Sequence, residues 1–315
     1  MKKMKNKKLL KLIVILGPTA SGKTELAIKL AKKFNGEIVS ADSRQIYKEM
    51  DIGTAKPTKK EIKAVPHHLI GIIKPNKDFN VAIYKRKALK AVRGLIERKK
   101  IPFLIGGTGL HIKAIVNNLK FPEVPANKKL REKLEKKTRE EVFAIYKKLD
   151  PQGAKFIDRK NKRRLIRAIE VCKATKKPFW QQRKRGKPLF NVLQIGMELP
   201  KNKLEQRIKK RVEQMIKRGL EKEAKSLTKK YGWGLPALQA IGYQEWSAFA
   251  KASADKKDYF SSLAEKQKKK IKEKIILHTI QFAKRQMTWF KKDKRIRWIG
   301  NYQEAEKLIK NFLLK

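Results

Sequence analysis

The sequence predicts an α/β fold in which helices flank a parallel sheet and an α-helical insertion interrupts the core. Strand-like and helix-like segments alternate through the first third of the chain, as a parallel sheet requires. A helical region punctuated by prolines follows, and strand character returns near residue 190. We therefore expect a core formed by residues 9–118 and 189–315, interrupted by a helical insertion domain at residues 119–188.

Apolar runs and helical periodicity place the elements of the first third. Within 80–99, Tyr84, Ala88 and Val92 recur at the four-residue spacing of an amphipathic helix. The continuous apolar run at 101–105 is typical of a buried strand. In order, we expect a strand at 11–16, a helix at 22–34, strands at 37–40 and 69–73, a helix at 80–99 and a strand at 101–105.

The second half is predicted to be mostly helical and basic. After the insertion we expect a strand at 190–199 and a helix at 203–217. Residues 256–292 predict one or two long basic helices, followed by a strand at 295–299 and a C-terminal helix.

Residues 17–24 carry the clearest motif. They read Gly-Pro-Thr-Ala-Ser-Gly-Lys-Thr and have the G-x-x-x-x-G-K-T spacing of a P-loop. The glycines let backbone N–H groups turn toward a phosphate, while Lys23 supplies a cation and Thr24 a metal-ligating hydroxyl. The fold class is therefore a P-loop NTPase-like sheet, and the expected phosphate-binding residues are Gly17, Pro18, Thr19, Ala20, Ser21, Gly22, Lys23 and Thr24.

Two further residues are expected beside this loop. Asp42 follows the second predicted strand, and Thr108 follows Gly106-Gly107 at the end of the strand over 101–105. Ligands of open α/β sheets bind at the carboxyl ends of the strands, so the P-loop, Asp42 and Thr108 should converge. Asp42 could be a general base, an outer metal ligand or a turn cap. Because Gly106 stands where ATP-hydrolysing P-loop proteins carry a metal-binding acid, bound diphosphate fits better than ATP hydrolysis.

The amino-acid composition indicates which classes of binding partner the protein favours. Lys and Arg number 82 against 29 Asp and Glu, a net charge of +53, which favours a polyanion such as nucleic acid. A lysine-rich genome or a salt-rich habitat would produce the same bias. The single Cys172 excludes an internal disulfide and fits a reducing cytoplasm. No apolar run approaches the ~18 residues of a membrane span, so we expect a soluble cytoplasmic protein without membrane contact. We also expect it to be a monomer.

Several further runs carry a family resemblance. They are Asp42-Ser43 with Gln45, Asp51-Ile52-Gly53-Thr54-Ala55-Lys56-Pro57, His67-His68, Arg163-Arg164 with Arg167, Gln239-Ala240-Ile241-Gly242-Tyr243, and Arg285-Gln286 with Thr288-Trp289. Together with the P-loop they resemble the tRNA dimethylallyltransferase (tRNA isopentenyltransferase) family from about Lys11 to Trp298. The resemblance implies transfer of a dimethylallyl group from dimethylallyl diphosphate to N6 of the adenosine 3′ to a tRNA anticodon, releasing diphosphate.

The resemblance also implies roles for individual residues. Asp42 would be the general base, Thr108 would lie near the reacting amine, and Arg211 would stabilise the leaving diphosphate with a Mg²⁺ ion held partly by Thr24. The expected partners are the tRNA anticodon stem-loop and dimethylallyl diphosphate. Contacts to tRNA are expected from Asp42, Ser43, Arg44, Gln45, Arg163, Arg164, Arg167, Gln239, Ala240, Ile241, Gly242, Tyr243, Gln244, Lys284, Arg285, Gln286, Thr288 and Trp289.

Two positions depart from the family pattern, and three other functions fit the P-loop. His111 stands where the family usually has tyrosine, and could either alter the wall of the substrate channel or add a group that titrates near pH 7; Gly71 replaces a common acid. Other functions that fit the P-loop are prenyl transfer to free adenine nucleotides, a small-molecule kinase and a non-catalytic nucleic-acid-binding protein. The long helical insertion and the basic C-terminal third favour tRNA as the acceptor.

Overall fold

The computed structural model describes residues 9–182, 184–246 and 265–315. These form two compact units. One runs to Val116 and resumes at Leu189, and the other comprises Asn117–Pro188.

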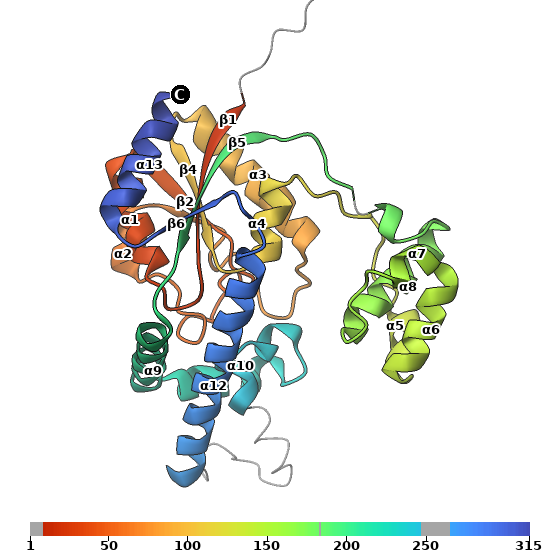
Figure 1. Cartoon of the computed structure of the whole chain (residues 1–315). Helices are drawn as coiled ribbons and strands as arrows, with labels where there is room; N and C mark the ends of the chain where they lie inside the picture. Colours follow the sequence, from red (N-terminus) through yellow and green to blue (C-terminus); the bar gives the residue numbers. More distant parts are fainter. Residues whose placement is uncertain (1–8, 183, 247–264) are drawn as a thin grey trace, which may run out of the picture. The chain divides into compact units, whose positions relative to one another are not determined.

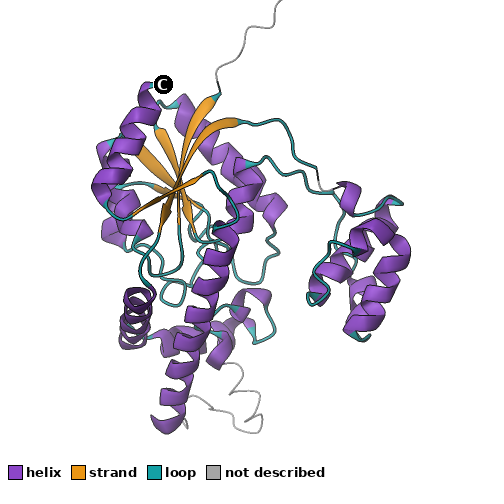
Figure 2. Cartoon of the chain, in the orientation of Figure 1, coloured by secondary structure: helices purple, strands orange, loops and turns teal. Residues whose placement is uncertain are grey.

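The first unit is built on one six-stranded parallel sheet (Figures 1 and 2). Its order is β3-β2-β4-β1-β5-β6, which confirms the predicted α/β class. The strands are β1 (Leu10–Leu16), β2 (Gly36–Ser40), β3 (His67–His68), β4 (Ile101–Gly106), β5 (Phe190–Met197) and β6 (Ile296–Ile299).

Helices cover both faces of this sheet (Figure 1). On β1, Leu12 and Val14 join the core beneath α3 and α4, while Ile13 and Ile15 join the core beneath α1 and α13. Burial on both faces explains why the strand is apolar without alternation. The helices of this unit are α1 (Lys23–Lys33), α2 (Lys59–Ala64), α3 (Val81–Glu97), α4 (Gly109–Val116), α9 (Lys201–Lys217), α10 (Leu220–Tyr231), α12 (Glu265–Phe290) and α13 (Tyr302–Leu314).

The second unit is a small helical domain with its own core. Its helices are α5 (Lys128–Glu135), α6 (Arg139–Leu149), α7 (Pro151–Ala154) and α8 (Lys162–Thr175). The core includes Val142, Leu165 and Ile169, each fully buried. The buried Asp150 is satisfied, because its carboxylate accepts hydrogen bonds from the Tyr146 hydroxyl at 2.8 Å and the Gly153 amide at 2.8 Å.

Two predicted elements differ from the structure. The strand expected at 69–73 is wrong: the ladder of β3 ends at His68, because Leu69 and Gly71 adopt positive φ angles of 64° and 59°, and Ile73 forms only an isolated parallel bridge with Tyr47. The Gly71 amide instead donates to the Gln45 carbonyl at 2.8 Å. In the predicted helical region 256–292, residues 256–264 lie outside the described part of the chain, and α12 is one continuous helix from Glu265.

Candidate active site

The loops that follow β1, β2 and β4 meet at the carboxyl edge of the sheet. The chain leaves β1 toward β2, whereas it leaves the adjacent β4 toward β5. Where two neighbouring parallel strands connect onward in opposite directions, the loops at their carboxyl ends separate and leave a crevice in which ligands bind. The Oγ1 atom of Thr108 accepts a hydrogen bond from the Ser43 amide at 3.1 Å, and the Thr108 amide donates to the Ala41 carbonyl at 3.3 Å. The predicted convergence of the loops after β2 and β4 is therefore observed.

The P-loop joins β1 to α1 in the predicted position. Gly22, which precedes the first residue of α1, has a φ angle of 92°, a region that residues with a Cβ rarely adopt. Lys23 Nζ donates to the Pro18 carbonyl at 3.0 Å, which holds its side chain across the loop. The Ser21 hydroxyl is buried and has no hydrogen-bond partner among the described residues. The loop thus brings an ammonium group and a buried, unpartnered hydroxyl together at the N-terminus of α1.

The side chain of Gln286, on α12, ties this loop to the loop after β4. Its Oε1 accepts from the Thr19 amide at 2.8 Å, and its Nε2 donates to the Gly107 carbonyl at 2.9 Å. Gln286 is buried, so the structure places this residue, expected to contact tRNA, inside the protein between two loops of the site.

Lys23, Asp42 and Arg211 are electrostatically coupled. Desolvation, and to a smaller extent repulsion from Arg211, lower the pKa of Lys23 to about 8, with Asp42 acting in the opposite direction. Burial also lowers the pKa of Arg211, while attraction to Asp42 raises it. The site therefore holds two cations and a carboxylate in a poorly solvated space, as stabilisation of a leaving anion requires.

The Asp42 carboxylate is oriented by the turn that follows β2. Its Oδ1 accepts hydrogen bonds from the Arg44 amide at 2.8 Å and the Gln45 amide at 3.2 Å. The turn cap considered from the sequence is therefore real, but it occupies one oxygen. Within the described part of the chain Oδ2 accepts no hydrogen bond, so that oxygen is available to take a proton.

The described residues offer limited means of holding a metal ion. No three His, Cys, Asp or Glu side chains gather among them in a way that could bind one. Mg²⁺ commonly keeps several waters and binds through one or two protein groups together with substrate phosphates. The partly buried Thr24, in the first turn of α1, fits that pattern.

Comparison with known proteins identifies the family. The family model described as IPP transferase matches residues 45–293. The chain belongs to the IPP transferase family. It is 41% identical to the tRNA dimethylallyltransferase of Halothermothrix orenii over 96% of this chain and 94% of that protein. It is 43% identical to the tRNA dimethylallyltransferase of Microcystis aeruginosa over 91% and 87%, respectively.

Solved structures of the IPP transferase family share the fold. The tRNA isopentenylpyrophosphate transferase of Bacillus halodurans is 33% identical, with a TM-score of 0.69 over 96% of this chain and 95% of that one. A eukaryotic dimethylallyltransferase acting on tRNA has a TM-score of 0.72 at 26% identity, over 89% of this chain and 69% of that one.

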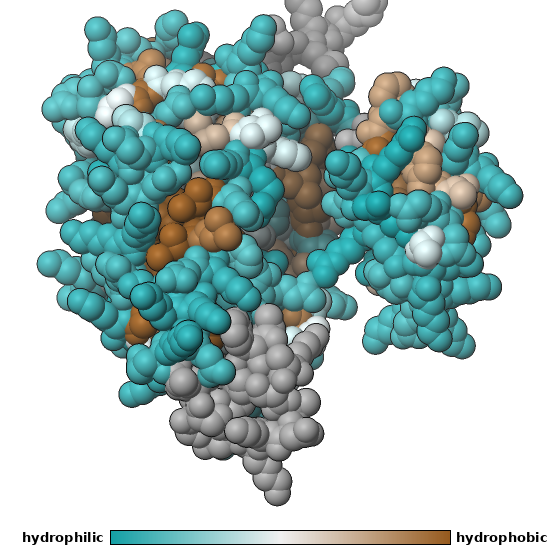
Figure 3. All heavy atoms as spheres, turned by 60° about the horizontal axis from the view of Figure 1, so that its bottom comes forward, coloured by the Kyte–Doolittle hydropathy of each residue, from teal (hydrophilic) through white to brown (hydrophobic). Residues whose placement is uncertain are grey.

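On α12 of this IPP transferase, the residues expected to contact tRNA are exposed, except for the buried Gln286. Trp289 is 40% exposed, and its ring lies 4.8 Å from Lys113 Nζ. The neighbouring Phe290 is buried instead. A surface pocket is lined by Lys284, Arg285, Thr288, Trp289 and Lys292. More broadly, hydrophilic side chains dominate the face drawn in Figure 3, with hydrophobic residues in small patches.

Other residues expected to contact tRNA already have partners inside the protein. Gln45 Nε2 donates to the carbonyls of Thr54 and Ala55 at 3.3 and 3.1 Å. Arg44 Nη1 donates to the Pro236 carbonyl at 2.8 Å, and the Tyr243 ring is buried. In the same segment Ala240 and Gly242 are buried, whereas Gln239 is exposed and Ile241 and Gln244 are partly exposed.

On α8, the arginines expected to contact tRNA differ in exposure. Arg163 is exposed and Arg164 partly exposed. Arg167 forms an ion pair with the buried Glu170 and donates to the Val124 carbonyl at 3.0 Å. Arg131 pairs with the same carboxylate at 2.8 Å. Arg167 therefore stabilises the helical domain internally.

Of the two effects considered for His111, the addition of a group titrating near pH 7 is wrong. Its imidazole stacks on the Tyr84 ring, with centroids 3.9 Å apart and planes inclined by 10°. Burial lowers the pKa of His111 to about 4, against a weaker opposite effect of Asp42. The residue is therefore neutral at pH 7 and forms part of the buried core on α4.

Two residues beside the site were missed by the sequence analysis. Arg207 lies one turn before Arg211 on α9 and its Nη1 donates to the Ser21 carbonyl at 3.3 Å. Glu223, on α10, contacts the loop at residues 51–53. No motif spacing singles out either residue; only the scarcity of acidic residues could have drawn attention to Glu223.

Among the helices of the described residues, none has the length and apolar character that crossing a bilayer demands.

Proposed function

We propose that this IPP transferase moves a dimethylallyl group from dimethylallyl diphosphate to N6 of the adenosine 3′ to the anticodon of tRNA. The products are N6-isopentenyladenosine in the tRNA and free diphosphate. We further propose that it acts as a cytoplasmic monomer.

One observation carries the proposal. Two cations lie at the P-loop with a carboxylate that uses only one of its oxygens in hydrogen bonds with the described residues, and the neighbouring strand β4 ends without an acidic residue. Lys23 and Arg211 are coupled to Asp42, and β4 ends in Gly106. A site for ATP hydrolysis needs an acid on its metal ion. A site for prenyl transfer needs cations around a leaving diphosphate and a base for the acceptor amine.

The residues fit the steps of such a transfer. The N6 lone pair of adenine is delocalised into the ring, so the amine is a weak nucleophile. As N6 forms its bond to C1 of the dimethylallyl group, the bond from C1 to the diphosphate oxygen breaks. Asp42 Oδ2 takes the proton that N6 loses, and the bond electrons leave with the diphosphate. Lys23, Arg211 and the P-loop amides stabilise the negative charge that develops there.

Thr108 and Thr24 complete the proposed site. Thr108 fixes the Ser43 backbone beside Asp42 through its 3.1 Å hydrogen bond, and so helps to hold the base in place. Thr24 would hold a Mg²⁺ ion together with the diphosphate oxygens. When bound, such an ion neutralises part of the charge on the leaving group.

The target base must leave the anticodon stack to enter the site. Enzymes that act on a base in nucleic acid extrude it into a pocket, and proteins read RNA loops through splayed bases and phosphate contacts. The exposed face of α12 with Lys284, Arg285 and Trp289 is suited to such contacts. It supports tRNA as the acceptor over a free nucleotide.

The test is to supply labelled dimethylallyl diphosphate with either tRNA or AMP and to measure which acceptor becomes labelled. We expect label in tRNA, lost when the adenosine 3′ to the anticodon is replaced. Label in AMP alone would favour a free-nucleotide transferase. Label in neither, with phosphate transfer from ATP to a small molecule, would favour a kinase and refute the proposal.

A further inference from the structure

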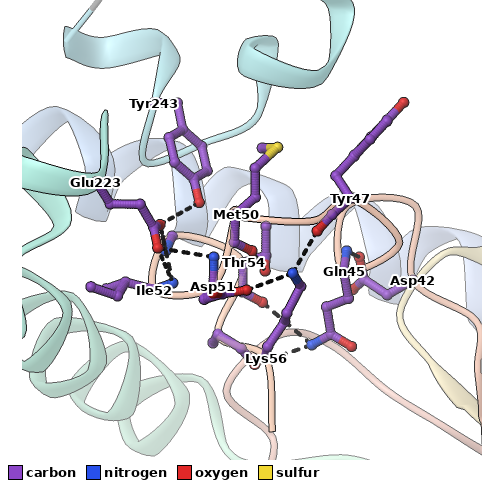
Figure 4. A network of polar contacts seen from close by, with 12 residues as sticks. Asp42, Gln45, Tyr47, Met50, Asp51, Ile52, Thr54, Lys56, Glu223 and Tyr243 are labelled. Atoms are coloured by element: carbon purple, nitrogen blue, oxygen red, sulfur yellow. Dashed lines mark hydrogen bonds and ion pairs between the residues drawn. The ribbon is translucent and has the colours of Figure 1, made fainter. Parts of the chain in front are cut away.

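Glu223 makes an unusual set of contacts for an acidic side chain in so basic a protein. Its Oε2 accepts hydrogen bonds from the amides of Asp51 at 2.9 Å and Ile52 at 2.8 Å. Its Oε1 accepts from the Gly53 amide at 3.0 Å and the Tyr243 hydroxyl at 2.6 Å (Figure 4). Three successive backbone amides and a phenol thus share one carboxylate. Hydrogen bonds to a charged group are about twice as strong as neutral ones.

The loop that Glu223 holds is also packed tightly. A Cβ atom on Gly53 would lie 2.5 Å from Cζ of the Tyr243 ring, so only glycine lets the loop approach this closely. The Thr54 hydroxyl donates to the Met50 carbonyl at 2.6 Å, and Lys56 Nζ pairs with the Asp51 carboxylate at 2.6 Å. Residues 51–56 therefore have one well-defined conformation while Glu223 is in place.

A short chain of contacts connects this loop to Asp42. The carbonyls of Thr54 and Ala55 accept the hydrogen bonds of the Gln45 amide group. The backbone N–H of Gln45 in turn donates to Asp42 Oδ1 at 3.2 Å. Figure 4 shows Gln45 between Lys56 and Asp42, with Glu223 on the far side of the loop. The Asp42 turn is thus braced by the segment that Glu223 holds.

Glu223 also belongs to the part of the fold that carries the proposed leaving-group cation. It lies on α10, which follows α9 after only Arg218 and Gly219, and α9 carries Arg211. Both helices pack into one core through Val212, Leu220 and Ala224. A carboxylate on α10 can therefore hold the turn that bears the base in fixed relation to the helix that bears the cation.

We infer that Glu223 is a positioning residue for the transfer reaction, which orients the Asp42 carboxylate by fixing residues 51–55 beneath Gln45. The inference rests on the proposed role of Asp42 as general base. Because protein donors occupy both oxygens of Glu223, its loss should reduce the rate of transfer and leave the binding of both substrates nearly unchanged.

The test uses Glu223→Gln in the full-length protein. A glutamine has nearly the same shape, but its NH₂ group would face a backbone N–H or the Tyr243 hydroxyl where an oxygen now accepts. We expect the single-turnover rate with saturating tRNA and donor to fall about 10- to 100-fold, the scale of a small misplacement of a catalytic group. The Kd values of tRNA and dimethylallyl diphosphate should change less than about twofold.

Glu221→Gln is the matched control. It removes the same charge from the same helix, but Glu221 pairs with Lys268 at 3.6 Å, whereas the amides of residues 51–53 donate to Glu223. Its rate should equal that of the wild type. Equal losses in the two variants would show that net charge, not position, matters, and would overturn the inference.

A double-mutant cycle separates positioning from general damage. In an Asp42→Asn background, Glu223→Gln should cause no further loss, because there is no base left to orient. If the double variant instead loses rate by the product of the two single losses, the two residues act independently and the inference is overturned. If Glu223→Gln does not fold, as judged by circular dichroism, Tyr243→Phe removes one of the donors and enters the same cycle with a smaller loss.

The outcomes distinguish the two proposals. If Asp42→Asn leaves the single-turnover rate unchanged, the proposed function of Asp42 fails, and the inference with it. If Asp42→Asn slows transfer but neither Glu223→Gln nor Tyr243→Phe does, only the inference about Glu223 fails.

Discussion

The charge on Lys23 should be lost within an accessible pH range. Desolvation and the Arg211 guanidinium together lower the pKa of Lys23 to about 8, whereas a lysine in water titrates near 10.4. Because the diphosphate is an anion, only the protonated ammonium group attracts it strongly. The site should therefore capture the donor well at pH 7 and poorly above pH 8.

The size of the effect follows from that pKa. With a pKa of about 8, the protonated fraction of Lys23 falls from about nine-tenths at pH 7 to about one-tenth at pH 9. If capture of the donor depends on that proton, kcat/KM for the donor should fall about tenfold over this interval, because this ratio reports the ionisations of the enzyme before the donor binds.

The assay is initial-rate transfer to tRNA at several donor concentrations between about pH 6.5 and 9.5. Lys23→Arg serves as the control, because a guanidinium stays charged throughout this range. Its absolute rate will be lower, but its profile should be flat where that of the wild type falls. A flat wild-type profile, or the same fall in Lys23→Arg, would refute the assignment of this titration to Lys23.

Three further outcomes are expected. Asp42→Ala should slow single-turnover transfer by about 10²- to 10⁴-fold with tRNA affinity nearly intact; an unchanged rate would exclude it as the base. Arg211→Ala should slow the chemical step by about 10²- to 10³-fold, and a normal rate with a normal donor KM would contradict its role. Affinity for tRNA should fall on the order of tenfold or more between about 50 and 200 mM salt, measured by filter binding; a flat dependence would show that the charge of +53 is not used in phosphate contacts.

The sequence was sufficient for those parts of the fold that depend on local pattern. β1 and β4 are buried on both faces and so appear as unbroken apolar runs. The α3 helix begins after Asn80, whose side chain caps the amides of Ala82 and Ile83. In both cases neighbouring residues determine the structure, so a pattern in the sequence is enough to predict it.

The sequence was not sufficient where contacts between residues far apart in the chain determine the structure. The apolar run at 69–73 looks like a strand, but its N–H groups bond to residues 45–46, which no local pattern can show. Gln286 and Tyr243 belong to recognisable motifs, yet their side chains point into the protein and hold loops together. The motif indicated that these residues matter without showing which way they face.

The Gln286 side chain joins α12 to the two loops that follow β1 and β4. The same helix, α12, presents Lys284, Arg285 and Trp289 on its exposed face and binds the loops after β1 and β4 from its buried face. A slide of this helix along its axis by even one residue, about 1.5 Å, would break both hydrogen bonds of the glutamine amide. In the proposed complex, an RNA on the exposed face of α12 and a diphosphate in the P-loop would therefore be held at a spacing to which the Gln286 bridge and the buried residues of α12 both contribute. An extruded base would have to cover that distance to reach the donor.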